Sequence, residues 1–157
     1  MRRKDREVTD YHEIMAIVER CDVCKLAMVD HDFPYIVPMN FGYSTDDGLL
    51  TLYFHGANEG KKINILKENP KVCFEMDCGH QMIIGETDCS YSMDYESVIG
   101  NGMVEFITSI DDKKFALAHI IKKYSKKAGF FFDEKLLDRI TIFKIVSRDF
   151  VGKRHSS

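Results

Sequence analysis

The pattern of apolar and polar residues predicts three amphipathic helices. Near the start of the chain, Asp10 and Glu13 form a capping-box pair, and apolar residues then recur at intervals of three and four. These apolar residues are Ile14, Ile17, Val18 and Cys21. A long helix is predicted from Ser109 to near Ala128 and Gly129. A shorter helix is predicted over 59–68, with Asn58 as its N-cap.

Alternating apolar and polar residues predict β-strands in most of the remaining chain. The predicted strands are 23–30, 35–43, 49–55, 71–77, 91–107 and 139–147. A hairpin turn is expected at 46–48, and the glycines at 100 and 102 indicate a bulge or a sharp bend. The three phenylalanines at 130–132 are expected in the core, followed by a helical turn over 133–138, whereas 78–90 fits no clear pattern. Five or six antiparallel strands with peripheral helices indicate an α+β domain built on a small antiparallel β-barrel.

Composition narrows the class of protein. The 157 residues fit one domain, 1–157, and the 45% hydrophobic and 30% charged content is typical of a globular protein. A net charge of −3 gives no general attraction to nucleic acid. No apolar run approaches the ~20 residues of a membrane span, so we expect a cytoplasmic protein without membrane contact. Five cysteines without a secretory signal predict reduced thiols.

One stretch suggests an anion-binding site at the junction of a strand and a helix. Gly56 and Ala57 allow close approach of a ligand to the backbone, and Lys61 and Lys62 fall in the first turn of the predicted helix. Free N–H groups and the helix dipole favour a phosphate there. The alternative is a solvated surface turn with two ordinary lysines. A P-loop is disfavoured, because the glycine spacing is one residue short and no Ser or Thr follows the lysines.

Three other features have competing interpretations. Pro38 cannot donate to a β-ladder, so it indicates an edge strand, a bulge or a segment that faces a ligand. The Cys21-x-x-Cys24 pair could belong to a zinc or dithiol site, but Cys21 lies on the apolar stripe of a predicted helix, which favours packing. His55 ends a strand beside the possible anion site and is either a proton-transfer group or a structural histidine.

Several motifs occur in an order and spacing that cover nearly the whole chain. They are Met1-Arg2-Arg3-Lys4-Asp5-Arg6, Leu26-Ala27-Met28-Val29, Tyr35-Ile36-Val37-Pro38-Met39-Asn40-Phe41-Gly42-Tyr43, Leu52-Tyr53-Phe54-His55-Gly56-Ala57 with Gly60-Lys61-Lys62, and Tyr95-Glu96-Ser97-Val98-Ile99-Gly100. Together they resemble the nitroimidazole-resistance (Nim-type) branch of the pyridoxamine 5′-phosphate oxidase-related flavoproteins. This resemblance implies a split β-barrel that binds flavin mononucleotide (FMN) and forms a homodimer with the flavin between the subunits.

The resemblance also assigns roles to residues of this chain. Gly56, Ala57, Lys61 and Lys62 would hold the FMN phosphate, and His55 would lie near the flavin ring and the substrate. The residues that would line the ring and ribityl chain are Val37, Pro38, Met39 and Asn40. Further contacts, from the same or the partner subunit, would come from Tyr95, Ser97 and Val98.

The implied activity is the reduction of nitroaromatic compounds such as 5-nitroimidazoles, with the flavin carrying the electrons. A small-molecule substrate is therefore expected, and no metal ion is required. One alternative is a flavin- or haem-binding carrier or sensor of the same fold without turnover. A third interpretation is a cofactor-free structural domain in which the lysines are only solvated.

Overall fold

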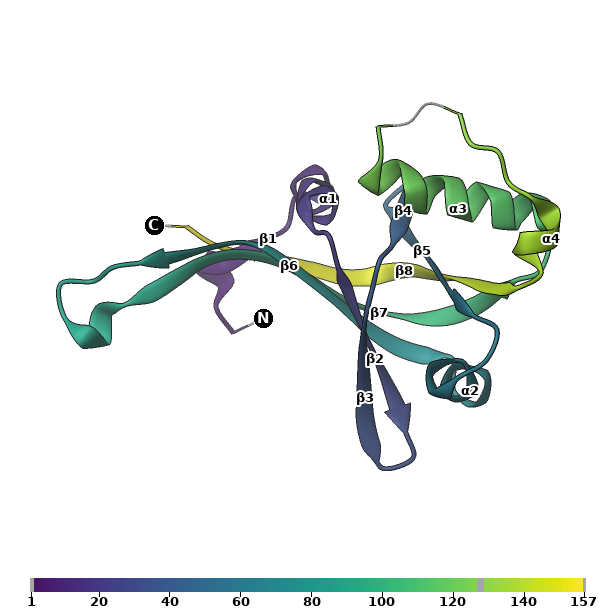
Figure 1. The fold of residues 1–157 in the computed structure, drawn as a ribbon. Helices are drawn as coiled ribbons and strands as arrows, with labels where there is room; N and C mark the ends of the chain where they lie inside the picture. Colours follow the sequence, from purple (N-terminus) through teal and green to yellow (C-terminus); the bar gives the residue numbers. More distant parts are fainter. Residues whose placement is uncertain (1, 127–128, 157) are drawn as a thin grey trace.

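The computed structural model describes residues 2–126 and 129–156 (Figure 1). The strands in this part of the chain are β1 (Glu7–Val8), β2 (Cys24–Asp30), β3 (Phe33–Met39), β4 (Gly42–Asp46), β5 (Leu49–Ala57), β6 (Lys71–Ile83), β7 (Ser92–Ile107) and β8 (Ile140–His155). The α-helices are α1 (Tyr11–Arg20), α2 (Lys61–Glu68), α3 (Ile110–Tyr124) and α4 (Glu134–Leu137). Short 3₁₀ turns lie at Lys4–Arg6 and Asp88–Ser90. None of the helices in the described ranges is long and apolar enough to cross a bilayer.

All eight described strands belong to one antiparallel sheet. Its order is β3-β2-β6-β7-β8-β5-β4, and the short β1 adds to β8 beside this path. The consecutive strands β3 and β4 lie at opposite ends of the order, and no pairing between them is present in the described residues. The sheet therefore curls without closing, which confirms the expected α+β split barrel. The eight strands exceed the five or six expected.

The core fills the inner face of the curled sheet. Alternate residues of the strands point inward, as their period of two requires, and Phe54 and Phe143 stack there with ring centroids 5.3 Å apart. Helix α1 covers this face with Ile14, Ile17 and Val18, all buried. Asp10 caps α1 as expected, because its carboxylate accepts a hydrogen bond from the Glu13 N–H at 2.9 Å.

The predicted strand over 35–43 is wrong in one respect, because the chain divides it into β3 and β4. The two strands occupy opposite edges of the sheet, so the chain must leave one and enter the other around Asn40 and Phe41. The Phe41 N–H, which no ladder uses, donates to the Tyr124 hydroxyl of α3 at 3.0 Å. A tertiary partner far along the sequence therefore stabilises the break.

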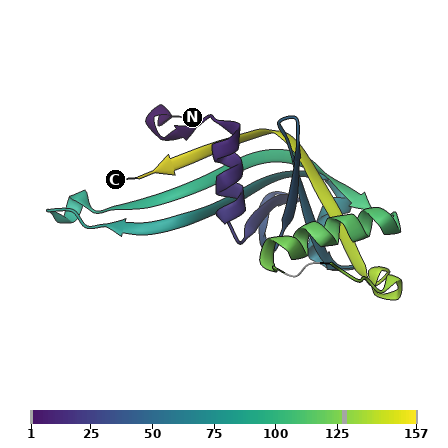
Figure 2. The ribbon, with the colours of Figure 1, turned by 90° about the horizontal axis from the view of Figure 1, so that it is seen from above.

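The segment 78–90 forms most of a projecting arm. Strand β6 continues to Ile83 and pairs with the start of β7, with a register irregularity between Cys78 and Gln81. Figures 1 and 2 show these two strands extending beyond the body of the molecule. The irregularity expected at Gly100 and Gly102 is confirmed as a bulge, because the pairing of β7 with β8 shifts register between Asn101 and Met103.

Several predicted boundaries and one burial assignment are corrected. Helix α2 begins at Lys61 instead of 59, and α3 ends at Tyr124, before the expected end near Ala128, which lies outside the described residues. The last strand continues to His155 because it pairs with the arm-side half of β7. Phe131 is 94% exposed and is not a core residue, although Phe132 packs against the small cluster beneath α3. The helical turn over 133–138 is confirmed by α4.

Candidate functional site

The turn between β5 and α2 is held by the neighbouring strand β8. The end of β5 pairs His55 with Ile142 and Gly56 with Thr141. Asn58, predicted as the N-cap of α2, has a different function. Its side-chain amide donates to the Asp138 carbonyl at 2.8 Å, and its side-chain oxygen accepts from the Thr141 hydroxyl at 3.0 Å. Asn58 therefore anchors the turn to the sequence around β8.

The N-cap of α2 is Gly60, with φ at +126° and no side-chain cap. This backbone conformation is accessible to glycine and strained for other residues. Because the first N–H groups of a helix have no partner within the helix, and no acidic residue lies in the first turn, the N-terminus of α2 favours an anion.

Lys62 is a partly buried cation without a carboxylate partner in the described part of the chain. Its Nζ lies 3.0 Å from the Met39 Sδ, a weak acceptor. Desolvation lowers the pKa of Lys62 from its ordinary 10.5. A Cβ at Gly56 would lie 3.2 Å from the same Nζ, so glycine leaves the space beside this ammonium open. Lys62, Gly56 and the N-terminus of α2 lie together as the predicted anion site requires, and their role in binding stays a prediction.

Lys61 points elsewhere. Its Nζ lies 2.7 Å from the Asp30 Oδ2 at the end of β2 and 4.8 Å from the centroid of the Tyr35 ring of β3. A hydrogen bond from Lys61 lowers the pKa of Asp30. The two consecutive lysines therefore differ, because Lys61 has a counter-ion within the protein and Lys62 does not.

The β3 segment predicted to line a flavin ring lies at an edge of the sheet. Pro38 pairs in register only with Lys25 of β2, so the edge-strand interpretation of this proline is confirmed. Met39 is buried and links β3 to Lys62, and Val37 is partly buried against the core. Pro38 and Asn40 are exposed. This edge leaves backbone and side chains free to contact a planar ligand.

His55 lies at the end of β5, close to Lys62. Its side chain is exposed by surface area, yet the surrounding protein desolvates the ring enough to lower its pKa from the ordinary 6.5. The charge of Lys62 is the second cause of this shift. The imidazole is therefore neutral at pH 7 and carries one N–H that can be donated. Ala57, two residues along, is also exposed.

Tyr95, Ser97 and Val98 lie in another region of the chain. Val98 pairs with Gly152, which in turn pairs with Val8 of β1, and Figure 1 shows β1 well separated from α2. Val98 is fully buried in the core and Ser97 is nearly so. Tyr95 packs beside His155, with ring centroids 6.2 Å apart. A single chain does not bring these residues to the anion site, and their role stays a prediction.

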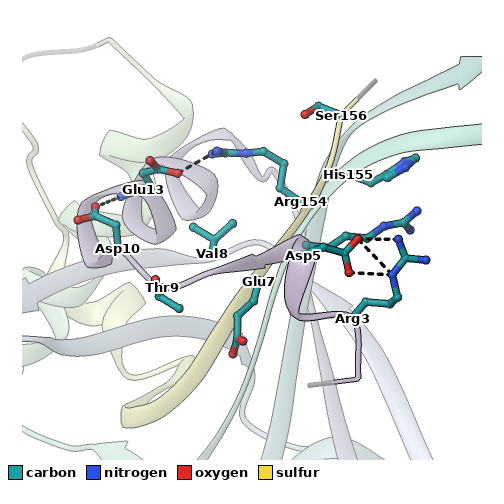
Figure 3. A pocket seen from close by; sticks show the side chains of 11 residues that line it. Arg3, Asp5, Glu7, Val8, Thr9, Asp10, Glu13, Arg154, His155 and Ser156 are labelled. Atoms are coloured by element: carbon teal, nitrogen blue, oxygen red, sulfur yellow. Dashed lines mark hydrogen bonds and ion pairs between the residues drawn. The ribbon is translucent and has the colours of Figure 1, made fainter.

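A cavity of about 520 Å³ lies between the N-terminal segment and the end of β8 (Figure 3), and it was not predicted from the sequence. Two of its three guanidinium groups are paired: Arg3 donates to Asp5 at 2.6 Å, and Arg154 donates to Glu13 at 2.8 Å and to Glu96 at 2.6 Å. The Nε of the third, Arg6, is buried without a hydrogen-bond partner in the described residues. The basic N-terminal motif was the available signal and contains Asp5, but the partners of Arg154 lie far from Arg154 along the chain and could not be predicted.

The cysteines do not assemble a metal site in the part of the chain that the structure describes, where no three His, Cys, Asp or Glu side chains converge. Cys21 and Cys24 are buried, and burial raises the pKa of both thiols, that of Cys24 to about 12. The packing interpretation of Cys21 agrees with its position in the core.

Comparison with known proteins places this geometry in a family. Residues 10–154 match the pyridoxamine 5′-phosphate oxidase family. A candidate 5-nitroimidazole antibiotic resistance protein from Bacteroides thetaiotaomicron is 35% identical, with a TM-score of 0.82 over 94% of this chain and 86% of that one. A comparison with curated protein sequences gave no match.

Two other solved structures share the fold at low identity. The flavocytochrome Anf3 from Azotobacter vinelandii is 16% identical, with a TM-score of 0.83 over 100% of this chain and 72% of that one. An FAD- and haem-binding protein from Mycobacterium smegmatis is 15% identical, with a TM-score of 0.79 over 97% of this chain and 74% of that one. The family resemblance seen in the sequence motifs is confirmed, and the chain belongs to the pyridoxamine 5′-phosphate oxidase family.

Proposed function

We propose that this protein is an FMN-dependent oxidoreductase that reduces nitroaromatic compounds such as 5-nitroimidazoles. The observation that carries the flavin assignment is the Lys62 ammonium, which is partly desolvated beside the N-terminus of α2 and lacks a carboxylate partner in the described residues. An unpaired cation in this position is costly unless an anion binds it. The nitroaromatic substrate is supported by the 35% identity to the Bacteroides protein.

The residues at α2 fit the phosphate monoester of FMN. A phosphate of this kind carries about −1.5 to −2 charges at pH 7 and three strong acceptor oxygens. Lys62 supplies a charged donor, the first N–H groups of α2 supply neutral donors, and Gly56 leaves room beside them. Val37, Pro38, Met39 and Asn40 on the edge strand would then orient the ring.

When bound, the flavin supplies the electron transfer. The chain supplies binding, orientation and one hydrogen-bond donor. His55 is suited to the last role, since its lowered pKa keeps the imidazole neutral at pH 7 with one N–H that would donate a hydrogen bond to the substrate. It lies near enough to Lys62 for the two to interact electrostatically, so it would lie beside the bound cofactor.

The proposed active form is a cytoplasmic homodimer with the flavin between the subunits. One face of the sheet presents large exposed apolar residues that share a side by register. They are Val29, Ile36, Ile99, Met103 and Val151. The same face contains an apolar hollow of about 540 Å³. A face of this kind favours association, and a second copy would supply Tyr95 and Ser97 to the site.

The visible absorption spectrum of the purified protein, followed by chromatography of the chromophore released by heat, tests this proposal. We expect heat to release FMN. In the intact protein, reduced under anaerobic conditions, we expect a 5-nitroimidazole to reoxidise the bound flavin. A colourless protein that does not take up added FMN would contradict it. A haem spectrum, or a flavin that does not respond to the nitro compound, would instead favour a carrier or sensor.

His55→Ala gives a separate test of the proposed hydrogen bond from His55 to the substrate. We expect turnover to fall by about tenfold or more while the flavin content stays near one per chain. Equal turnover in the variant and the parent protein would reduce His55 to a packing residue.

A further inference from the structure

The Asp30–Lys61 ion pair lies at the entrance to the proposed phosphate site, and the following inference rests on that proposed function. Asp30 ends β2, and the turn that follows it leads into β3, which continues to Val37 and Met39. The ion pair therefore connects the tip of the β2–β3 hairpin to the N-terminus of α2. This ion pair joins the two halves of the proposed flavin site, the edge-strand hairpin and the helix start, in addition to the contact between Met39 and Lys62.

Charge balance at the site is incomplete while this ion pair exists. Lys62 offers one positive charge, whereas a phosphate monoester carries nearly two negative charges at pH 7. Lys61 is the adjacent residue in the first turn of α2, on a flexible four-carbon stem, and its side chain is 58% exposed. Its ammonium is therefore free to turn toward an anion at the helix start if it leaves Asp30.

We propose that Asp30 competes with the flavin phosphate for Lys61, so that Lys61 moves from the carboxylate to the phosphate when FMN binds. A doubly charged phosphate beside Lys62 is a stronger partner for an ammonium than a single carboxylate. Asp30 keeps its existing contact with the His31 ring, whose Nδ1 lies 3.4 Å from the Asp30 Oδ1. Asp30 thus lowers the affinity for flavins that carry a phosphate and leaves the affinity for riboflavin unchanged.

The test compares FMN with riboflavin, which lacks the phosphate, by quenching of flavin fluorescence on the apoprotein. Asp30→Asn should bind FMN roughly twofold to fivefold more tightly, the effect expected from loss of one exposed ion pair, and riboflavin equally well. Asp32→Asn is the matched control, because Asp32 lies in the exposed turn that directly follows Asp30 and makes no ion pair within the described residues.

A second comparison separates release of Lys61 from a general field effect of the Asp30 charge. In a Lys61→Met background, Asp30→Asn should no longer tighten FMN binding. Tightening that persists in this background, equal effects of Asp30→Asn and Asp32→Asn, or weaker FMN binding by Asp30→Asn would each overturn the proposal. If the parent protein binds neither flavin, the proposed function fails and this inference fails with it. If the parent protein binds FMN, the flavin assignment stands, and the variants then test the competition by Asp30 alone. Melting temperatures of the apoproteins show that the variants are folded.

Discussion

Two regions of this protein are rich in cationic side chains, and they differ in whether those cations have partners. Around the N-terminal cavity, Arg3 binds Asp5, and Arg154 binds both Glu13 and Glu96. At the start of α2, Lys62 has only the Met39 sulfur within hydrogen-bonding distance in the described residues. Arg6 also lines this cavity, and its buried Nε has no hydrogen-bond partner in the described residues, but Arg3 and Arg154 are neutralised by carboxylates of the protein. We therefore expect an anionic ligand at Lys62, which has no carboxylate partner in the described part of the chain and lies beside the first N–H groups of α2.

The largest expected loss of FMN affinity is for a substitution of Lys62. Lys62→Met should weaken FMN binding by about tenfold to hundredfold, because it removes a charged donor to the phosphate. Its effect on riboflavin binding should be small. Lys61→Met is the matched control and should weaken FMN binding less, since in the absence of ligand Lys61 already has a partner in Asp30. Fluorescence titration measures all four affinities, and equal losses in the two variants would remove the distinction between the lysines.

In the region of paired arginines, we expect a substitution to change the stability of the protein instead of its affinity for FMN. Glu96 accepts from Arg20 at 2.5 Å and from Arg154 at 2.6 Å, and its side chain is only 18% exposed. Glu96→Ala leaves two guanidinium groups facing each other, so we expect the free energy of unfolding to fall by about 1 to 2 kcal/mol. This is less than for a fully buried pair, because both arginines remain partly exposed. Urea denaturation of the apoprotein measures the change, and an unaltered midpoint would show that the network is not stabilising.

The lowered pKa of Glu96 leads us to expect that the stability of the protein depends on pH. Desolvation would raise the pKa of Glu96, but hydrogen bonds from Arg20 and Arg154 outweigh it and lower the pKa below its ordinary 4.5. Its contribution to stability is therefore complete above pH 4.5 and is lost as the pH falls through the lower pKa of the folded state. The stability difference between the parent protein and Glu96→Gln should be constant from pH 5 to 7 and shrink below 4.5. A difference that grows on acidification would contradict this assignment.

A smaller effect is expected from Gly56→Ala, which tests the space beside Lys62. The added Cβ would lie 3.2 Å from the Lys62 Nζ, and the flexible ammonium can move by a few tenths of an ångström. FMN binding should weaken by roughly threefold while the melting temperature changes by less than about 2 °C. Unchanged FMN affinity would show that the phosphate does not approach this glycine.

The smallest effect is expected for Arg3→Gln at the rim of the N-terminal cavity. Arg3 and Asp5 are both largely exposed, and exposed ion pairs contribute little to stability. We expect a shift in melting temperature of less than about 2 °C and no change in FMN affinity. A large loss of FMN affinity would move the anion site from α2 to the arginine-lined cavity.

The sequence predicted the local features that depend on neighbouring residues. The Asp10 cap, the strand that carries Pro38 at an edge and the bulge between Asn101 and Met103 all follow from short patterns. The placement of Lys61 and Lys62 in the first turn of α2 was also predicted correctly, because the glycines before them and the apolar spacing after them are local.

Features decided by distant partners could not be predicted in the same way. Asn58 is a residue type that is common at N-caps, but its side chain hydrogen-bonds to Asp138 and Thr141. Gly60 is the N-cap of α2 instead. Lys61 and Lys62 cannot be distinguished in the sequence. They differ in the structure because Asp30, some thirty residues earlier, provides a counter-ion for Lys61 and not for Lys62. The pairing of Arg154 with Glu13 likewise joins the two ends of the chain.

A crystal structure of the protein with bound FMN tests the central claim most directly. The phosphate should lie at the N-terminus of α2, within hydrogen-bonding distance of the Lys62 Nζ and close to Gly56. A phosphate bound in the N-terminal cavity beside Arg3 and Arg154, with Lys62 still directed only at Met39, would contradict the account.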